Sequence, residues 1–344
     1  MAVPAVTLVI LNWNGRALLE RFLPSVLASG YPDFRVLVVD NGSTDDSLNW
    51  LAAHLPAVQT LALDQNYGFA EGNNRALPLI DTPYFALINS DAEVTPGWLD
   101  PMIRRMEAHP EIAVVQPKLR DWELRGRFEY AGASGGFIDA LGYPFCRGRM
   151  FDTVEQDEGQ YDTAMPIFWA TGACCVIRTE VVREHGLFDP AFFAHMEEID
   201  FCWRVQNAGY QVWVEPASVA YHVGGATLPQ GSPRKTYLNA RNSLACLYKN
   251  LPAGQLLPKL LLRLLLDGVW GLRFLLQRQP AMVGALLRAH RDFYLSTGRL
   301  RRERRRMQMQ RVRQMPAAGR LRGSAVWAYF IQRKHRWSDL FPAG

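Results

Sequence analysis

Apolar runs alternate with helical patterns along the first 120 residues, and this alternation constrains the fold more than any other feature. Residues 5–11 (AVTLVIL) have no period, as in a strand that is buried on both faces. Residues 16–28 then carry apolar side chains at helical spacing. Further strands are expected at 35–40, 58–63, 84–89 and 112–117, and helices at 43–54, from about 68, and at 96–108. This order predicts a parallel α/β sheet with helices on both faces.

Residues 119–166 break the pattern. They are rich in Gly, Arg and aromatic residues and have weak periodicity, which indicates an irregular or short-stranded excursion over the sheet. Residues 169–178 are apolar again, residues 192–209 have helical spacing, and residues 211–214 predict a short strand. From residue 252 onward the sequence shows only helical patterns and basic tracts.

Polar side chains follow each of the first four predicted strands. Ligands of open α/β sheets bind beyond the carboxyl ends of the strands, so we expect these side chains to converge there. Taken alone, Asp40-Asn41-Gly42-Ser43 is more typical of a turn followed by a helix cap at Ser43, and Asn89-Ser90-Asp91 also fits a simple turn. Only the convergence of these groups favours a site. No GxGxxG follows the first strand, which argues against a dinucleotide-binding fold. The converging residues are Asn12, Asp40, Asn66, Gly68, Asn89, Ser90 and Asp91.

Six stretches resemble a known family: LVILNWNG, VVDNGSTD, QNYGFAEGNN, LINSDAEV, TGACCVIR and GLFDPAFFAHMEEIDFCWRVQNAGY. With a late His222, they look like family 2 glycosyltransferases of the GT-A fold, closest to the bacterial rhamnosyltransferase-like branch. The motifs occur in family order over residues 5 to about 250, and they are specific as a set. The resemblance implies a GT-A type, mostly parallel sheet flanked by helices.

The resemblance also implies a donor site. Asp40 would accept a hydrogen bond from a pyrimidine base, and Asn12 and Asn66 would line the nucleoside pocket, with Gly68 and Asn89 also at the nucleotide. Asn89-Ser90-Asp91 occupies the DxD position, so Asp91 is the expected ligand of Mg²⁺ or Mn²⁺, with His222 as a second ligand. A hard cation of this kind neutralises a diphosphate leaving group. Without the resemblance, an ordinary hydrogen-bonded histidine after a strand is the preferred interpretation of His222.

Inverting transfer needs a base for the acceptor hydroxyl, and a carboxylate usually serves. The segment HMEEIDFCWR offers Glu197, Glu198 and Asp200. The family pattern there is Glu-Asp-x-Asp, and Glu198 replaces its first Asp, so Glu198 is the expected base. On a helix, Glu198 and Asp200 lie about 200° apart and do not face one site. Asp200 is therefore expected to pair with Arg204, four residues later.

Charge divides the chain into two parts. Residues 251–344 carry 19 Lys and Arg against 4 Asp and Glu, whereas residues 1–250 carry 19 against 29. The net charges of the two parts have opposite signs, which indicates that the parts have different roles. We therefore expect a nucleotide-sugar glycosyltransferase domain over 1–250 and a helical, Arg-rich extension over 251–344 that associates with a membrane or with the acceptor.

Residues 256–278 are very apolar but carry five charged side chains: Lys259, Arg263, Asp267, Arg273 and Arg278. At 100° per residue these fall within a stripe about 140° wide. Five charges argue against a spanning helix and favour one in the membrane interface, the alternative being a helix docked on the catalytic domain. Residues 299–322 hold ten Arg without interleaved aromatics, so we expect an anionic lipid surface or a lipid-diphosphate acceptor and no nucleic acid.

The cysteines and the N-terminus bear on location. The five cysteines (Cys146, Cys174, Cys175, Cys202 and Cys246) are odd in number and have no CxxC spacing, which predicts buried free thiols. The start MAVPAVTLVILNWNG has no basic n-region and no small-residue cleavage site. We therefore expect no secretory signal, and a cytoplasmic protein that is peripheral on the inner face of the cell membrane.

These features predict an inverting, metal-dependent glycosyltransferase. It would move a sugar from a dTDP- or UDP-sugar to a glycan or lipid-linked glycan acceptor, and rhamnose is the first candidate for that sugar. The expected process is polysaccharide biosynthesis for the cell envelope. Two alternatives remain: a non-catalytic nucleotide- or carbohydrate-binding relative, motivated by the departures at Asn89 and Glu198, and a polyanion-binding protein led by the Arg-rich tail.

Overall fold

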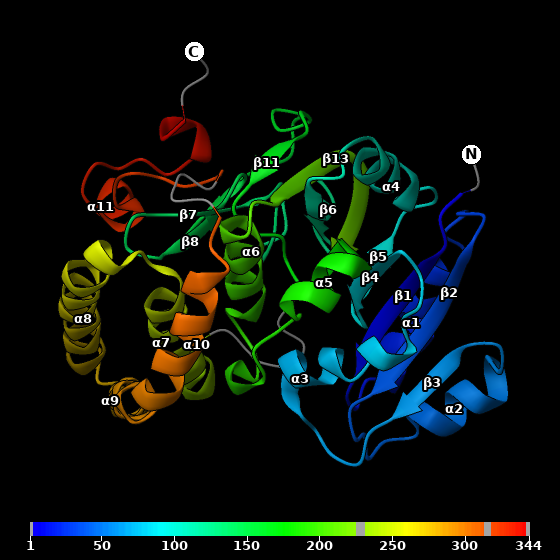
Figure 1. Ribbon diagram of the computed structural model, residues 1–344, viewed down its shortest axis with the longest axis horizontal. Coiled ribbons are helices and arrows are strands. Elements are labelled where there is room, and N and C mark those ends of the chain that lie inside the picture. The colour runs from blue at the N-terminus through cyan, green and yellow to red at the C-terminus, as the bar shows by residue number, and fades with distance from the viewer. Residues whose placement is uncertain (1–2, 225–230, 313–317, 342–344) are drawn as a thin grey trace.

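The computed structural model describes residues 3–224, 231–312 and 318–341, and consists of two sheets surrounded by helices (Figure 1). The main sheet has nine strands in the order β11-β13-β6-β12-β4-β1-β2-β3, with β5 paired to β13. A smaller sheet has the order β10-β9-β8-β7. Its strands all lie within residues 119–166, which confirms the predicted short-stranded excursion.

The longest strands are β6 and β13 of the main sheet, and the strands of the smaller sheet are short. Their bounds are β1 Val6–Asn12, β2 Phe34–Asp40, β3 Gln59–Ala62, β4 Tyr84–Asn89, β5 Ala92–Val94, β6 Ile112–Asp121, β7 Gly136–Ile138, β8 Pro144–Cys146, β9 Arg149–Met150, β10 Thr153–Val154, β11 Met165–Ile167, β12 Cys174–Arg178 and β13 Gln211–His222.

The helices fall into one group along the main sheet and one toward the C-terminus. Their bounds are α1 Arg16–Leu27, α2 Ser47–His54, α3 Gly68–Asn74, α4 Leu99–Ala108, α5 Thr179–His185, α6 Glu197–Asn207, α7 Pro233–Asn250, α8 Ala253–Leu276, α9 Pro280–Leu295, α10 Thr297–Met309 and α11 Ala325–Phe330, with 3-10 turns η1 Leu77–Leu79, η2 Pro190–Phe192 and η3 Trp337–Asp339.

The main sheet is mostly parallel, as the resemblance implied, but it also contains antiparallel strands. Strands β3, β2, β1 and β4 are parallel neighbours, but β12 runs antiparallel to both β4 and β6. The antiparallel strand has a physical reason. A parallel neighbour needs a crossover connection that returns the chain to the starting end of the sheet, and the excursion after β6 provides none before β12. A mostly parallel sheet flanked by helices remains.

The central strands are buried on both faces, as predicted. Val6, Leu8 and Ile10 of β1 belong to one hydrophobic cluster, which also contains residues of α1 and α4. Val9 belongs to the other cluster, with residues of α5 and α6. Successive strand residues point to opposite faces, so this division follows directly from the strand geometry. All five cysteines are buried and free, which confirms that prediction.

The second predicted helix begins later than expected. It starts at Ser47 after the cap residue Asp46, so Ser43 does not cap it. Ser43 instead lies in the loop after β2, where its backbone N–H donates to Asp40 Oδ1 and its hydroxyl accepts from the backbone N–H of Asn14. The loop after β2 is thus held against the segment that follows β1, and α2 starts only after this contact.

The C-terminal helices pack on the rest of the protein, and α8, α9 and α10 gather beside α7 (Figure 1). Phe293 of α9 and Leu300 of α10 are buried in the same cluster as residues of the main sheet and α6. The proposed division at residue 250 therefore separates charge but does not separate the hydrophobic core. Part of the Arg-rich stretch, residues 313–317, lies outside the described residues.

Helix α8 has the predicted charged stripe, but the centre of the stripe faces the protein. Arg263 and Asp267 are buried and paired, with Nε of Arg263 3.1 Å from Oδ1 of Asp267. Arg263 also donates to Ser243 of α7, and Asp267 lies 3.3 Å from His290 of α9. Leu256, Leu260 and Leu264 pack against the hydrophobic core, whereas other leucines point outward, and Leu265 and Leu276 are 69% and 76% exposed. No helix in the described ranges has the length and apolar character needed to cross a membrane.

Candidate active site

Asn12 and Asp40 meet where β1 and β2 end side by side. The parallel register aligns Asn12 with Asp40, and the Asn12 amide donates to Asp40 Oδ2 at 3.0 Å. Asp40 Oδ1 accepts from the backbone N–H of Ser43 at 2.9 Å. Each carboxylate oxygen therefore keeps capacity for another donor. The side-chain oxygen of Asn12 is buried without a partner among the described residues, and a donor from a ligand would relieve about 1–3 kcal/mol of desolvation.

Asn66, in the loop after β3, and Gly68, the first residue of α3, are tied to the end of β2 through Asn41. The Asn66 side-chain oxygen accepts from the backbone N–H of Gly68 and from the Asn41 amide. Gly68 has a φ of +78°, and a Cβ there would lie 2.6 Å from the carbonyl oxygen of Phe193. Only glycine allows this close approach, which places the residues that precede α6 against this loop.

Asp91 and His222 meet at the ends of β4 and β13. Strand β5 follows Asp91 and pairs antiparallel with β13, with Ala92 opposite His222. This register places Nε2 of His222 3.1 Å from Oδ1 of Asp91 and 3.2 Å from the amide nitrogen of Asn89. Asp91 and His222 are both buried. The predicted pair is therefore assembled by strand register, from positions 131 residues apart.

Glu129 completes this group. Its Oε1 lies 3.2 Å from Nδ1 of His222, so the imidazole is held between two carboxylates. Burial alone would lower the pKa of His222, but hydrogen bonds and charges from Asp91 and Glu129 raise it to about 10. Burial would raise the pKa of Asp91, but the hydrogen bond and charge of His222 lower it below its ordinary value.

The Asp91–His222 pair fits a divalent cation that binds together with a ligand. Neighbouring ligands of a six-coordinate cation with bonds of about 2.1 Å lie about 3 Å apart, which matches the 3.1 Å between Oδ1 and Nε2. Glu129 would hold the other ring nitrogen of His222, as carboxylates commonly do behind metal-binding histidines. Within the described ranges, no three His, Cys, Asp or Glu side chains are grouped to hold a metal. Further ligands would have to come from a bound molecule.

Helix α6 carries the candidate base at its first turn. Glu198 Oε2 is enclosed and has no hydrogen-bond partner in the parts of the chain that the structure describes. Burial raises the pKa of Glu198 to about 7, and burial also raises the pKa of the neighbouring Glu197. A carboxylate that has one unpaired oxygen and a pKa near neutrality is suited to accept a proton.

Asp200 has a structural environment, as predicted. It is fully buried, and its Oδ2 lies 3.1 Å from Nε of Arg204 and 2.9 Å from the ammonium of Lys249. Lys249, on α7, also binds Asp189 at 2.7 Å. This buried network fixes α6 against α7 and leaves Asp200 with no free oxygen, because Oδ1 accepts from Asn250.

Glu129 and Lys249 are the residues near the site that the sequence pattern misses. Glu129 lies between β6 and β7, in a segment without periodicity, and Lys249 lies in the last turn of an ordinary helix. Neither residue lies at the end of a strand, and neither belongs to a sequence motif with a characteristic spacing. Both are placed by contacts over long sequence separations, 93 residues for Glu129 with His222 and 49 for Lys249 with Asp200.

Comparison with known proteins identifies the family of this chain. A family model described as glycosyl transferase family 2 matches residues 7–186. The chain is 27% identical over 226 residues to the N-acetylglucosaminyl-diphospho-decaprenol L-rhamnosyltransferase of Mycobacterium tuberculosis, covering 61% of this chain and 73% of that protein.

Solved structures show the same fold. S. aureus TarS 1–349 in complex with UDP-GlcNAc superposes with a TM-score of 0.55 at 16% identity, covering 89% of this chain and 88% of that one. The mannosyltransferase PcManGT of Pyrobaculum calidifontis, in complex with GDP-Man and Mn²⁺, gives 0.52 at 17% identity, covering 90% and 85%. These likenesses confirm the expected GT-A type fold. Because the family model spans more than half of the sequence, the chain belongs to glycosyl transferase family 2 and is a glycosyltransferase.

Proposed function

We propose that this glycosyltransferase moves a sugar from a nucleoside-diphosphate sugar to a glycan or lipid-linked glycan acceptor, with Mg²⁺ or Mn²⁺ and with inversion at the anomeric carbon. The observation that carries this proposal is the Asp91–His222 pair. Glu129 contacts the other ring nitrogen of His222, and the pair lies at the same edge of the sheet as Asn12 and Asp40. The solved neighbours bound UDP-GlcNAc, or GDP-Man with Mn²⁺, which supports a nucleotide-sugar donor and a divalent cation.

The donor would lie along the ends of β1, β2 and β4. Asp40 and Asn12 would hold the base, where Asn12 has its unpartnered oxygen. Asn66 and Gly68 would shape the nucleoside pocket, and Asn89 would lie beside the diphosphate. The cation, when bound at Asp91 and His222, would neutralise charge on the leaving diphosphate. A dTDP- or UDP-sugar is the expected donor, and dTDP-rhamnose is the first candidate because the M. tuberculosis relative is a rhamnosyltransferase.

Glu198 would take the proton of the acceptor hydroxyl. Its unpartnered Oε2 supplies the acceptor lone pair, and a pKa of about 7 leaves much of it ionised at neutral pH. Loss of the proton makes the hydroxyl oxygen a nucleophile for displacement on the face opposite the leaving group, which inverts the anomeric centre. Asp200 would not substitute for Glu198, because Arg204, Lys249 and Asn250 occupy its oxygens.

The extension over residues 251–344 would hold the enzyme at an anionic membrane surface on the cytoplasmic side. The outward face of α8 is a row of exposed apolar side chains, and Arg301, Arg302, Arg305 and Arg306 are exposed on α10. An apolar helix face together with basic residues is typical of interfacial binding. A lipid-linked acceptor fits this location, since the M. tuberculosis relative is named for a decaprenol diphosphate. The apolar row contains Leu257, Leu261, Leu262, Leu265, Val269, Leu272, Leu275 and Leu276.

A thermal-shift screen of nucleotide sugars, with and without Mn²⁺, would test the donor and the cation together. A ligand at 100 times its Kd should stabilise the native protein by about 2.7 kcal/mol. We expect dTDP- and UDP-sugars to raise the unfolding temperature only when the cation is present, and the same donors to support sugar transfer. Stabilisation or transfer that persists in a chelator would contradict the metal, and failure of every nucleotide sugar would contradict the donor class.

A further inference from the structure

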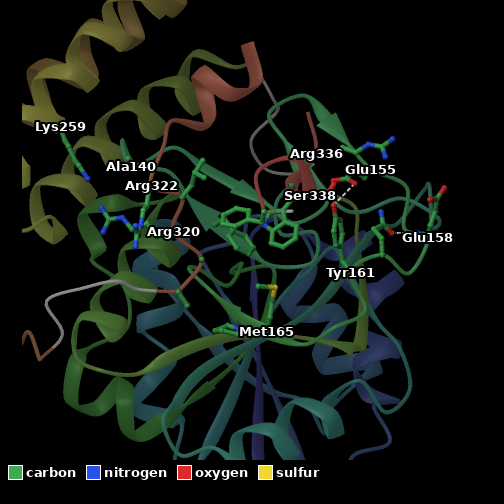
Figure 2. Close-up of a pocket in the computed structure, with 18 residues that line it drawn as sticks. Ala140, Glu155, Glu158, Tyr161, Met165, Lys259, Arg320, Arg322, Arg336 and Ser338 are labelled. Carbon is green, nitrogen blue, oxygen red and sulfur yellow. Dashed lines mark hydrogen bonds between the residues drawn. The ribbon is translucent and has the colours of Figure 1, made fainter. Parts of the chain in front are cut away.

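A cavity of about 1210 Å³ lies away from the catalytic edge, between the smaller sheet, α8 and the segment that carries α11 and η3 (Figure 2). Its floor is aromatic. Trp337 and Phe341 are stacked with ring centroids 5.0 Å apart, and Phe137 lies 5.3 Å from each. The indole nitrogen of Trp337 is buried without a hydrogen-bond partner among the described residues. The cavity exceeds the usual 300–1,000 Å³ of a small-molecule pocket and so suits an extended ligand.

One end of the cavity is cationic. Figure 2 shows Lys259 of α8 together with Arg320 and Arg322 at this end. The ammonium of Lys259 donates to the amide oxygen of Gln255 at 2.8 Å, and not to a carboxylate. Burial and the adjacent charge of Arg320 lower the pKa of Lys259. The negative charge of Asp139 opposes these effects at both Lys259 and Arg320, but the pKa of each stays lowered. Like charges held together in a partly buried place therefore favour the binding of a further anion.

The opposite end differs in charge. Glu155 and Glu158 line it, and the carboxylate of Glu155 accepts from the Tyr161 hydroxyl at 3.1 Å (Figure 2). Arg336 also lines the cavity and lies beside Glu155 in Figure 2, so the charges at this end are mixed. The end formed by α8 is cationic, and aromatic rings lie between the two ends. A ligand that matches this order has an anionic head and an apolar body.

We propose that this cavity binds a phosphorylated isoprenoid, with its phosphate or diphosphate among Lys259, Arg320 and Arg322 and its apolar chain on the rings of Phe137, Trp337 and Phe341. Arginine and lysine are the usual partners of phosphate oxygens, and apolar chains gain by leaving water for an aromatic surface. The cationic end includes α8, whose exposed leucines form the proposed membrane surface, so a membrane lipid would reach it over a short path. The inference rests on the proposed lipid-linked acceptor and assigns a place for its lipid.

Equilibrium dialysis of the full chain with labelled farnesyl diphosphate would test this. Farnesyl diphosphate should bind, and unlabelled farnesol and inorganic pyrophosphate should each compete at least about tenfold more weakly, because each offers only half of the interactions. Equal competition by pyrophosphate would mean that the cavity binds any anion, and would overturn the inference. Displacement by phosphatidylglycerol vesicles would mean that a lipid surface is recognised, with the same consequence.

Two paired variants locate the binding. The double variant Lys259→Gln with Arg322→Gln should weaken farnesyl diphosphate binding by about tenfold or more. The matched control, Arg273→Gln with Arg288→Gln, removes two exposed charges from α8 and α9 outside the cavity and should leave binding unchanged. Equal effects of the two pairs would overturn the assignment.

The aromatic floor has its own variant. Trp337→Ala should weaken farnesyl diphosphate but not pyrophosphate, and Trp337→Phe should restore most of the loss. Equal weakening of both ligands would overturn the proposed place of the chain. Transfer to a lipid-free acceptor separates this inference from the proposed function. Normal transfer without isoprenoid binding refutes the lipid site alone, and isoprenoid binding without any transfer refutes the proposed function alone.

Discussion

Replacing Glu198 by Gln should make the enzyme slower and, above neutral pH, more stable. The substitution keeps the size of the side chain but removes its ability to take a proton. Burial raises the pKa of Glu198 from an ordinary value of 4.5 to about 7. A rise of this size means that burial disfavours the ionised carboxylate by roughly 3 kcal/mol, and Gln escapes this cost.

The sign of the stability change depends on pH. Below pH 4.5 the carboxyl is protonated in the folded and the unfolded chain, so variant and wild type should be equally stable. As pH rises from 4.5 to about 7, the unfolded chain loses the proton first, and the wild type loses stability. Above about pH 7 the variant should keep the full advantage of roughly 3 kcal/mol. Urea unfolding at pH 4 and pH 8 measures this difference directly.

Transfer should change in the opposite direction. Without the base, transfer should fall by about 10²–10⁴-fold. The wild-type rate should fall as pH drops below about 7, because the proton then occupies Glu198, and the residual rate of the variant should lack this step. Glu198→Asp should retain partial activity, since Asp is the residue of the family pattern.

Two neighbouring substitutions serve as controls. Glu197→Gln removes another buried carboxyl with a raised pKa, about 100° further round the helix. It should stabilise the protein and keep most of the transfer activity. Asp200→Asn breaks the buried contacts with Lys249 and Arg204 and should cost about 3–5 kcal/mol of stability. If Glu198→Gln retains normal transfer, or Asp200→Asn abolishes it at unchanged stability, the base is assigned wrongly.

Four further predictions concern the rest of the site and the extension. Asp91→Ala should abolish transfer and the cation-dependent stabilisation by donor; a variant that works normally in a chelator would contradict this role. Glu129→Gln should weaken Mn²⁺ affinity, measured with donor bound, by about 10–100-fold through His222, and unchanged affinity would reduce Glu129 to a structural contact. Asp40→Asn should weaken binding of uracil or thymine donors by an amount worth about 1–3 kcal/mol, which calorimetry would measure, and equal affinity for a cytosine donor would count against it. Leu265→Gln with Leu272→Gln should reduce co-sedimentation with anionic liposomes at constant catalytic activity on soluble acceptors, and unchanged co-sedimentation would contradict a membrane role for α8.

The strand-end residues could be predicted because their geometry is local. A parallel strand delivers the residue at its carboxyl end to a known edge, so Asn12 and Asp40 had to lie close together. Helical spacing likewise separates Glu198 from Asp200 and pairs Asp200 with Arg204, and the structure has this ion pair. These predictions needed only the period of each element.

The remaining features depend on contacts that periodicity does not encode. The position of Glu129 is set by an irregular segment that folds back on β13. For α8, helical periodicity predicts that the charged residues share one face but not whether that face contacts the protein or solvent. The face that carries Arg263 and Asp267 contacts the protein, because Ser243 and His290 bind this buried pair. The reversal of β12 arises in the same way, from the path of the excursion before it.

The ionic network around Lys249 bears on how this enzyme can be re-engineered. Lys249 on α7 joins Asp200 of α6 to Asp189, and Arg299 of α10 binds the same Asp189 at 3.0 Å. A chimera that grafts a foreign C-terminal region after α7 would strip Asp189 of one of its two cations and uncover Phe293 and Leu300 contacts in the shared core. The C-terminal region can therefore not be exchanged independently of the rest of the protein. Donor and acceptor preferences should be recombined by exchanging loops at the strand edge, with the helices from α6 to α10 transferred as one piece.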